Sequence, residues 1–134
     1  MALPRLLPAA RALVVGSAAV ITVLGLAWLS ARSSSVARAN EALARLDAPV
    51  LVFAEPHLAR EMGARYGQRR WLTAHGPDAL ADAADLVRRV GEDRFVVVSR
   101  EDEPTIRGWH VSGRSSVTLF AGVPLQVTSL RWGR

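Results

Sequence analysis

The chain has 134 residues, half of them hydrophobic and 22% charged, with a formal net charge of +5 and no cysteine. A chain this apolar is not a disordered tail, and the lack of cysteine excludes disulfides, thiolate nucleophiles and cysteine-ligated metals. From residue 41 onward, thirteen arginines face twelve acidic residues. The excess charge therefore lies in the first forty residues, and we predict no nucleic-acid partner because a nucleic-acid-binding protein clusters its basic residues on the folded domain.

Residues 12–31 form an apolar segment without a single charge. At about 1.5 Å per residue, a helix of this length spans roughly 30 Å, the thickness of a hydrocarbon core. Its flanks carry the excess arginines, and a tryptophan near its far end suits the membrane interface. These membrane-flanking residues are Arg5, Arg11, Trp28, Arg32 and Arg38. We predict that residues 1–32 are a short lead and a transmembrane helix, with the lipid bilayer as partner.

A cleaved secretory signal peptide is the alternative to an anchor. Signal peptides have a shorter apolar core, of about 7–15 residues. A small-residue pattern, Ala37-Arg38-Ala39, follows the apolar segment at a distance and contains an arginine. We therefore favour an uncleaved signal-anchor, which makes the chain a single-pass protein of the cell membrane. Because a short N-terminal lead usually acts as an export signal, we expect the following domain to be extracytoplasmic, although the flanking arginines are nearly balanced.

A juxtamembrane helix is predicted over residues 33–47. Apolar residues recur there at helical spacing, at Val36, Ala39, Leu43 and Leu46. The serines at positions 33–35 are either a brief break or a turn of one continuing helix. Pro49 ends the segment, because the residue before a proline disfavours helical backbone.

Residues 48–134 are predicted to form one small α/β domain. Short β-rich runs at residues 50–53, 70–73 and 95–98 alternate with two helical segments. The first helix begins at Pro56 and ends at Gly67. The second begins at residue 76 and ends at Gly91, with one apolar face formed by Leu80, Ala83, Ala84, Val87 and Val90. Strands that alternate with helices imply a parallel sheet with helices on its faces.

The last thirty residues change character. Residues 105–112, 115–120 and 123–132 are expected to be strands, with turns at Gly113-Arg114 and Ala121-Gly122. Pro124 would need an edge or a strand start. The predicted fold class is therefore α/β: an N-terminal transmembrane helix, then a small three-layer βαβαβ parallel sheet with an antiparallel β extension.

Polar side chains follow the three predicted parallel strands, at the point where each strand ends. In open α/β sheets, ligands bind beyond the carboxyl ends of the strands. A carboxylate, two imidazoles and a guanidinium at one rim could bind a ligand or move protons, although loops are polar in any case. The candidate ligand-binding residues are Glu55, His57, Thr73, His75, Ser99, Arg100 and Glu101.

Two familiar kinds of site do not fit these residues. A dinucleotide site needs glycines at the first strand–helix turn, but the turn here is Phe53-Ala54-Glu55-Pro56-His57. A zinc hydrolase would show closely spaced histidines, whereas His57, His75 and His110 are far apart. We predict no metal site and no cofactor, and we assign no catalytic residue.

The stretch from residue 41 to 100 resembles a known class of proteins. It reads Ala-Leu-Ala-Arg-Leu at 42–46, Pro-His-Leu-Ala-Arg-Glu at 56–61, Tyr-Gly-Gln-Arg-Arg-Trp-Leu at 66–72 and Phe-Val-Val-Val at 95–98. This is similar to the last membrane helix and soluble C-terminal domain of bacterial GT-C-type membrane glycosyltransferases. The resemblance implies an extracytoplasmic domain without catalytic residues, which in that class lie between earlier membrane helices.

We therefore expect a membrane-anchored domain with a non-catalytic accessory or interaction role at the cell envelope, with another membrane protein as a candidate partner. The chain could be a stand-alone relative of these glycosyltransferases or the part that carries only the last span. The alternative is a ligand-binding or enzymatic module that uses the rim around Glu55, His57 and His75.

Overall fold

The computed structural model describes residues 8–61, 69–100, 104–118 and 122–133. Contacts divide the chain into two compact units, residues 1–34 and 35–134. The long helix α1, Pro8–Ala44, contributes to both units and runs through the three serines without a break. Of the two readings of these serines, the continuing helix is the one the structure shows.

The first unit consists of an exposed apolar helix. Among the described residues, one helical stretch, Ala12–Ala44, is long and apolar enough to cross a membrane. Leu13 is 75% exposed and Ile21 is 70% exposed. Ser17 and Thr22 donate hydrogen bonds from their hydroxyls to the carbonyls of Val14 and Ala18, so these polar groups are satisfied within the helix. The segment fits a membrane anchor, and because it lies near the N-terminus it also fits a signal sequence.

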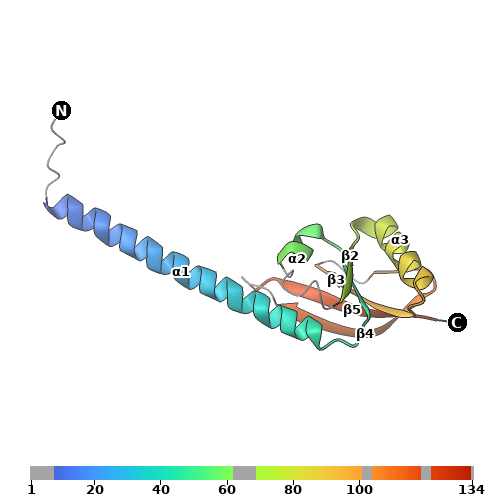
Figure 1. Cartoon of the computed structure of the whole chain (residues 1–134). Helices are drawn as coiled ribbons and strands as arrows, with labels where there is room; N and C mark the ends of the chain where they lie inside the picture. Colours follow the sequence, from blue (N-terminus) through green and yellow to red (C-terminus); the bar gives the residue numbers. More distant parts are fainter. Residues whose placement is uncertain (1–7, 62–68, 101–103, 119–121, 134) are drawn as a thin grey trace. The chain divides into compact units, whose positions relative to one another are not determined.

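The second unit is an α/β domain built around a mixed sheet. After α1 the elements are β1 (Val50–Phe53), α2 (Pro56–Glu61), β2 (Arg70–Thr73), α3 (Gly76–Arg89), β3 (Arg94–Ser99), β4 (Trp109–Thr118) and β5 (Pro124–Trp132). Within the described ranges these strands form one five-stranded sheet in the order β2-β1-β3-β5-β4 (Figure 1). Strand β1 pairs in parallel with both β2 and β3. The expectation of an apolar N-terminal helix followed by an α/β domain is confirmed at this level.

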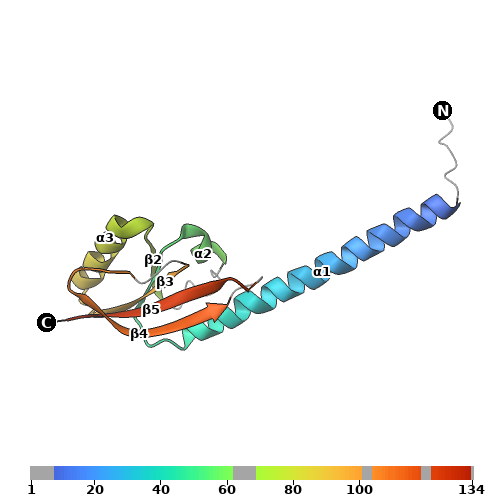
Figure 2. The ribbon, with the colours of Figure 1, turned by 180° about the vertical axis from the view of Figure 1, so that it is seen from behind.

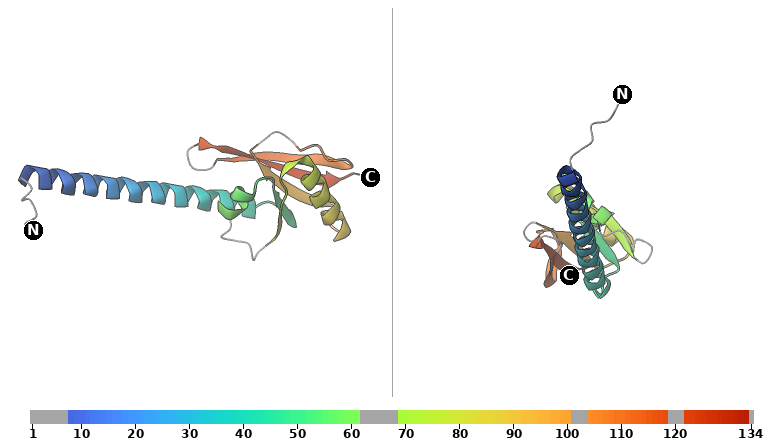
Figure 3. Two further views of the ribbon diagram at one scale, coloured as in Figure 1. Left: turned by 90° about the horizontal axis from the view of Figure 1, so that it is seen from above. Right: turned by 90° about the vertical axis from the view of Figure 1, so that its left-hand side faces the viewer.

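The two C-terminal strands extend the sheet beyond β3 and add antiparallel pairs to it. Strand β5 pairs antiparallel with β3 and with β4 (Figures 2 and 3). Pro124 is the first residue of β5, the strand-start position that its missing N–H requires. The predicted turn at Gly113-Arg114 is wrong, because both residues lie inside β4. The glycine instead falls at a register shift, where a bulge interrupts the pairing with β5. Residues 119–121, which include part of the other expected turn, lie outside the described residues.

Two apolar clusters cover the two faces of the sheet. Leu51, Phe53, Val96 and Val98 project to the face that also holds the apolar residues of α2 and of the last turns of α1. Val50, Val52, Phe95 and Val97 alternate with them and meet α3 on the other face. This alternation explains why β1 and β3 are apolar throughout: each is buried on both sides.

Helix α3 follows its predicted pattern except at its last apolar residue. Leu80, Ala83, Ala84 and Val87 are buried. Val90 was expected on the same face but is half-exposed, because it is the C-cap and lies outside the helical turns. Gly91 then takes a left-handed conformation, with φ of 85°, and its N–H donates to the Arg88 carbonyl. Helix α2 ends at Glu61, and its predicted continuation through Met62 and Tyr66 lies outside the described residues.

The C-terminal end of α1 is held by an arginine from just before β2. The Arg69 guanidinium donates from Nη2 to the Ala44 carbonyl at 2.6 Å and from Nη1 to the carbonyls of Leu43 at 3.2 Å and Ala48 at 3.4 Å. Helix α1 has no basic residue in its own last turn. Arg69 therefore supplies both the donors and the positive charge that a helix C-terminus lacks.

The Arg69 contacts predict a specific loss of stability. Arg69→Met should lower the free energy of unfolding by roughly 2 kcal/mol, because partly buried carbonyls lose charged donors. The matched control is Arg70→Met, since the Arg70 side chain is 68% exposed and its ion pair among the described residues is a long one, with Glu92 at 3.8 Å. That change should cost less than about 1 kcal/mol. Urea unfolding of the full chain in detergent micelles measures both, and equal losses would contradict the capping role.

An aromatic cluster closes the α3 side of the sheet at the end of β5. Trp109 meets Phe95 and Trp132 edge-to-face, with ring centroids 4.6 and 5.5 Å apart. The Arg88 guanidinium lies 4.8 Å from the Trp132 ring centroid. Gly108 makes room for this ring: its φ is 81°, and a Cβ there would lie 2.6 Å from two Trp132 ring atoms. The close approach explains the glycine.

Two glycines with the same backbone conformation allow this steric effect to be isolated. A Cβ at Gly91, with φ of 85°, would meet nothing within 4 Å. Gly91→Ala should therefore cost only the left-handed strain of about 1–2 kcal/mol. Gly108→Ala should cost about 1–3 kcal/mol more, because Trp132 must move. Urea unfolding gives the free energies, near-ultraviolet circular dichroism reports the tryptophans, and equal costs would contradict the packing account.

Candidate functional site

The three parallel strands, β1, β2 and β3, have their carboxyl ends at the same end of the sheet, which is called here the strand-end edge. The Ala54 N–H donates to the Val98 carbonyl at 3.0 Å, and the Ala74 N–H donates to the Phe53 carbonyl at 2.9 Å. These bonds link the residues just after β1 and β2 to the neighbouring strands. Strand β1 lies between β2 and β3. The chain therefore passes from β1 to β2 on one side and then crosses over β1 to reach β3 on the other side. This reversal of strand order is the place where α/β sheets hold ligands.

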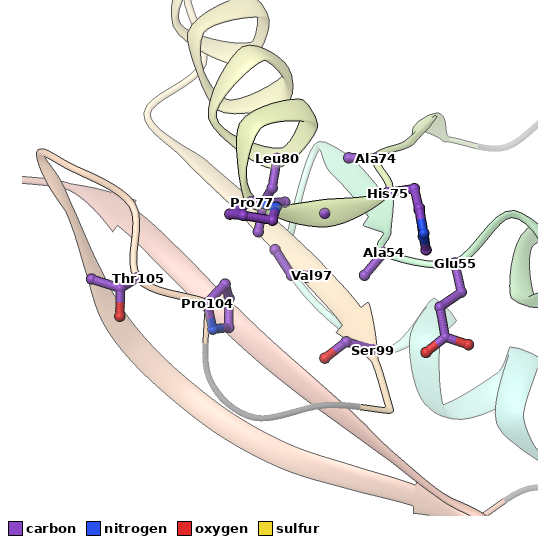
Figure 4. Close-up of a pocket in the computed structure, with 11 residues that line it drawn as sticks. Ala54, Glu55, Ala74, His75, Pro77, Leu80, Val97, Ser99, Pro104 and Thr105 are labelled. Atoms are coloured by element: carbon purple, nitrogen blue, oxygen red, sulfur yellow. The ribbon is translucent and has the colours of Figure 1, made fainter.

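A pocket of about 490 Å³ opens at this edge, on the side of α3 (Figure 4). This volume falls within the range of small-molecule sites. Its walls combine strand ends, the first turns of α3 and the segment before β4. The lining residues are Ala54, Glu55, Ala74, His75, Gly76, Pro77, Leu80, Val97, Ser99, Pro104 and Thr105. In the view of Figure 4, Glu55 and His75 stand on one side of the pocket and Pro104 and Thr105 on the other.

The most constrained charged group at the pocket is the Glu55 carboxylate. Its Oε2 lies 3.0 Å from His57 Nε2 and 3.6 Å from Arg100 Nε. The Glu55 side chain is only 18% exposed, whereas those of His57 and Arg100 are about half-exposed. These two neighbours therefore restrict the orientation of the carboxylate. Both contacts fall on Oε2, so among the described residues Oε1 remains available to accept a hydrogen bond.

The structure brings together most, but not all, of the residues expected at this rim. Glu55, His75 and Ser99 line the pocket. His57 and Arg100 do not line it but contact Glu55. Thr73 is exposed at the end of β2 and is not part of the lining. Glu101 lies outside the described residues.

The apolar wall of the pocket was not expected from the sequence. Pro77 and Leu80 of α3, Val97 of β3, and Pro104 all contribute to it. Leu80 belongs to the apolar face of α3, and Val97 belongs to the apolar strand β3. In the sequence, both patterns predict burial and do not distinguish a pocket wall from a core. The position of Pro104 in the sequence could have indicated the pocket, because this residue follows β3, whose carboxyl end lies there.

The opening of α3 at the pocket offers little to a bound anion. His75 is the N-cap residue and makes no side-chain capping bond. Pro77 in the first turn has no N–H to donate. Asp78, also in the first turn, places a carboxylate near the positive end of the helix.

A metal centre is not indicated at this edge. Among the described residues, no group of three or more histidine or acidic side chains could hold a metal ion. What the site offers is one oriented carboxylate, an exposed imidazole and the Thr105 hydroxyl beside an apolar wall. These groups suit hydrogen bonding to a small molecule.

Comparison with known proteins leaves this geometry as the main guide to function. No family model, curated protein or solved structure matches the chain.

Proposed function

We propose that this chain is a single-pass, membrane-anchored α/β domain with a non-catalytic accessory or interaction role at the cell envelope. Helix α1 is the observation that supports this. Its apolar part is exposed, with Ile21 at 70% and Leu24 at 64%, whereas Ala39 and Leu43, near its end, belong to the core of the domain. An apolar surface of this length is stable in a bilayer and costly in water.

The finer features of the proposal come from the sequence. We take the domain to be a three-layer βαβαβ unit with an antiparallel extension, and we place it on the extracytoplasmic side, as the resemblance to GT-C-type tails implies. The resemblance to GT-C-type tails suggests the partner, another membrane protein that transfers lipid-linked sugars.

The anchor can be tested by placing charge at its centre. Each arginine at the middle of a membrane helix costs about 2.5–3.5 kcal/mol of insertion free energy. Ile21→Arg combined with Leu24→Arg should therefore move the chain out of the carbonate-resistant membrane fraction. Ile21→Ala with Leu24→Ala is the matched control and should leave it there.

The same preparation distinguishes an anchor from a signal peptide. The intact mass of the wild-type chain from membranes should correspond to the uncleaved sequence. Loss of about forty N-terminal residues would instead establish a cleaved signal and contradict the anchor.

A second candidate function is the binding of a small ligand at the strand-end pocket. The specific observation in its favour is the position of the pocket: it opens where the strand order reverses, and residues from three strand ends line it. In this reading Glu55 and His75 contact the ligand, and His57 orients Glu55.

This second function predicts binding that is local to the pocket. In the full chain in phosphatidylcholine nanodiscs, at least one of inorganic phosphate, ethylammonium and myo-inositol should shift the methyl resonances of Leu80. Those of Leu86, which is exposed on the same helix and does not line the pocket, should stay unchanged. Glu55→Ala with His57→Ala should abolish the shift. If no probe moves Leu80, or if the double variant responds like the wild type, the pocket is not a ligand site.

A further inference from the structure

The charge distribution around the strand-end pocket indicates which class of small molecule it would take; this inference rests on the second proposed function. Among the described lining residues there is one carboxylate, Glu55, and no arginine or lysine. The remaining polar side chains are an imidazole and the hydroxyls of Ser99 and Thr105. The rest of the wall is apolar.

Anionic ligands are poorly matched to this lining. Phosphate and carboxylate sites in proteins use arginine, lysine or several backbone N–H groups. The Arg100 guanidinium, which contacts the lining residue Glu55, is engaged with that carboxylate at 3.6 Å. The start of α3 has lost one donor to Pro77 and carries the Asp78 carboxylate. An anion would therefore lose its hydration without gaining a cationic partner.

Cationic ligands are also poorly matched, although the pocket contains a carboxylate. The charge of Glu55 is balanced by Arg100, and His57 Nε2 lies 3.0 Å from the same oxygen. A bound ammonium group would face the Arg100 guanidinium as well as the carboxylate, so its net attraction would be small.

An uncharged hydrogen-bond donor fits these constraints. Two neighbours hold Oε2, so Glu55 presents Oε1 as an acceptor of fixed orientation, and a charged acceptor strengthens a hydrogen bond from a neutral hydroxyl. Leu80, Pro77 and Val97 offer an apolar surface for the carbon skeleton. We propose that the pocket binds an uncharged polyhydroxylated molecule, with Glu55 as the main hydroxyl acceptor.

The test compares three probes of different charge on the full chain in phosphatidylcholine nanodiscs, whose headgroup carries no hydroxyl. The probes are myo-inositol, inorganic phosphate and ethylammonium, each titrated while the Leu80 methyl resonances are recorded. Myo-inositol should bind most tightly. Its Kd should stay constant between about 10 mM and about 500 mM NaCl, although the Debye length falls from about 30 Å to below about 8 Å.

A conservative variant tests the role of Glu55. Glu55→Gln should weaken myo-inositol binding roughly tenfold, because the charged acceptor becomes neutral. Glu92→Gln is the control: it also removes a carboxylate that is paired with an arginine, Arg70, and lies outside the lining. It should leave the Kd unchanged. The salt comparison on the wild-type chain stands even if the Glu55 variant folds poorly.

The outcomes separate this inference from the proposed ligand site. Tighter binding of phosphate or ethylammonium, or a Kd for myo-inositol that rises steeply with salt, would overturn the polyol assignment and leave the ligand site in place. An unchanged Kd in a folded Glu55→Gln variant would also overturn the assignment. Failure of all three probes to move Leu80 would overturn both.

Discussion

The rest of the structure depends on the unfavourable exposure to water of the apolar side chains in the first half of α1. Twenty consecutive uncharged residues form most of this segment, and none of the residues in its apolar 18-residue window is buried in the part of the chain that the structure describes. Burial of apolar surface stabilises by about 25 cal/mol per Å², so a bilayer is the favourable solvent. The same helix contributes Ala39 and Leu43 to the domain core. One helix thus supplies both the exposed apolar segment and part of the domain core.

Chain topology accounts for the second notable feature, the pocket. Helices α2 and α3 follow successive parallel strands and pack on opposite faces of the sheet. Their connections therefore diverge at the carboxyl end of β1, where the pocket lies. Polar residues collect there because loops can be solvated. Glu55 is the charged residue among them that lines the pocket: its side chain is only 18% exposed, and His57 and Arg100 hold its carboxylate. This constraint makes it the residue on which a binding function would depend.

Local signals predicted the parallel part of the fold well. The runs Val50–Phe53 and Arg70–Thr73 were placed at their observed bounds, because short apolar or aromatic runs between turn residues leave little choice. Gly113-Arg114 misled because glycine also occurs at bulges, and only the pairing with β5 decides between bulge and turn. The rim residues Glu55, His75 and Ser99 followed from topology. The apolar wall of the pocket could not be predicted in this way, because a residue such as Leu80 shows the same helical spacing whether it lines a pocket or lies in the core.

The central claim is that the first part of α1 lies in lipid while its last turns belong to a folded domain in water. Spin labels test it directly, since the chain has no native cysteine to compete with single introduced ones. In liposomes, labels at Ile21→Cys and Leu24→Cys should be more accessible to oxygen, which partitions into lipid, than to a water-soluble nickel complex. A label at Glu41→Cys, exposed on the same helix, should show the reverse. Preferential access of the nickel complex to positions 21 and 24 would contradict the account.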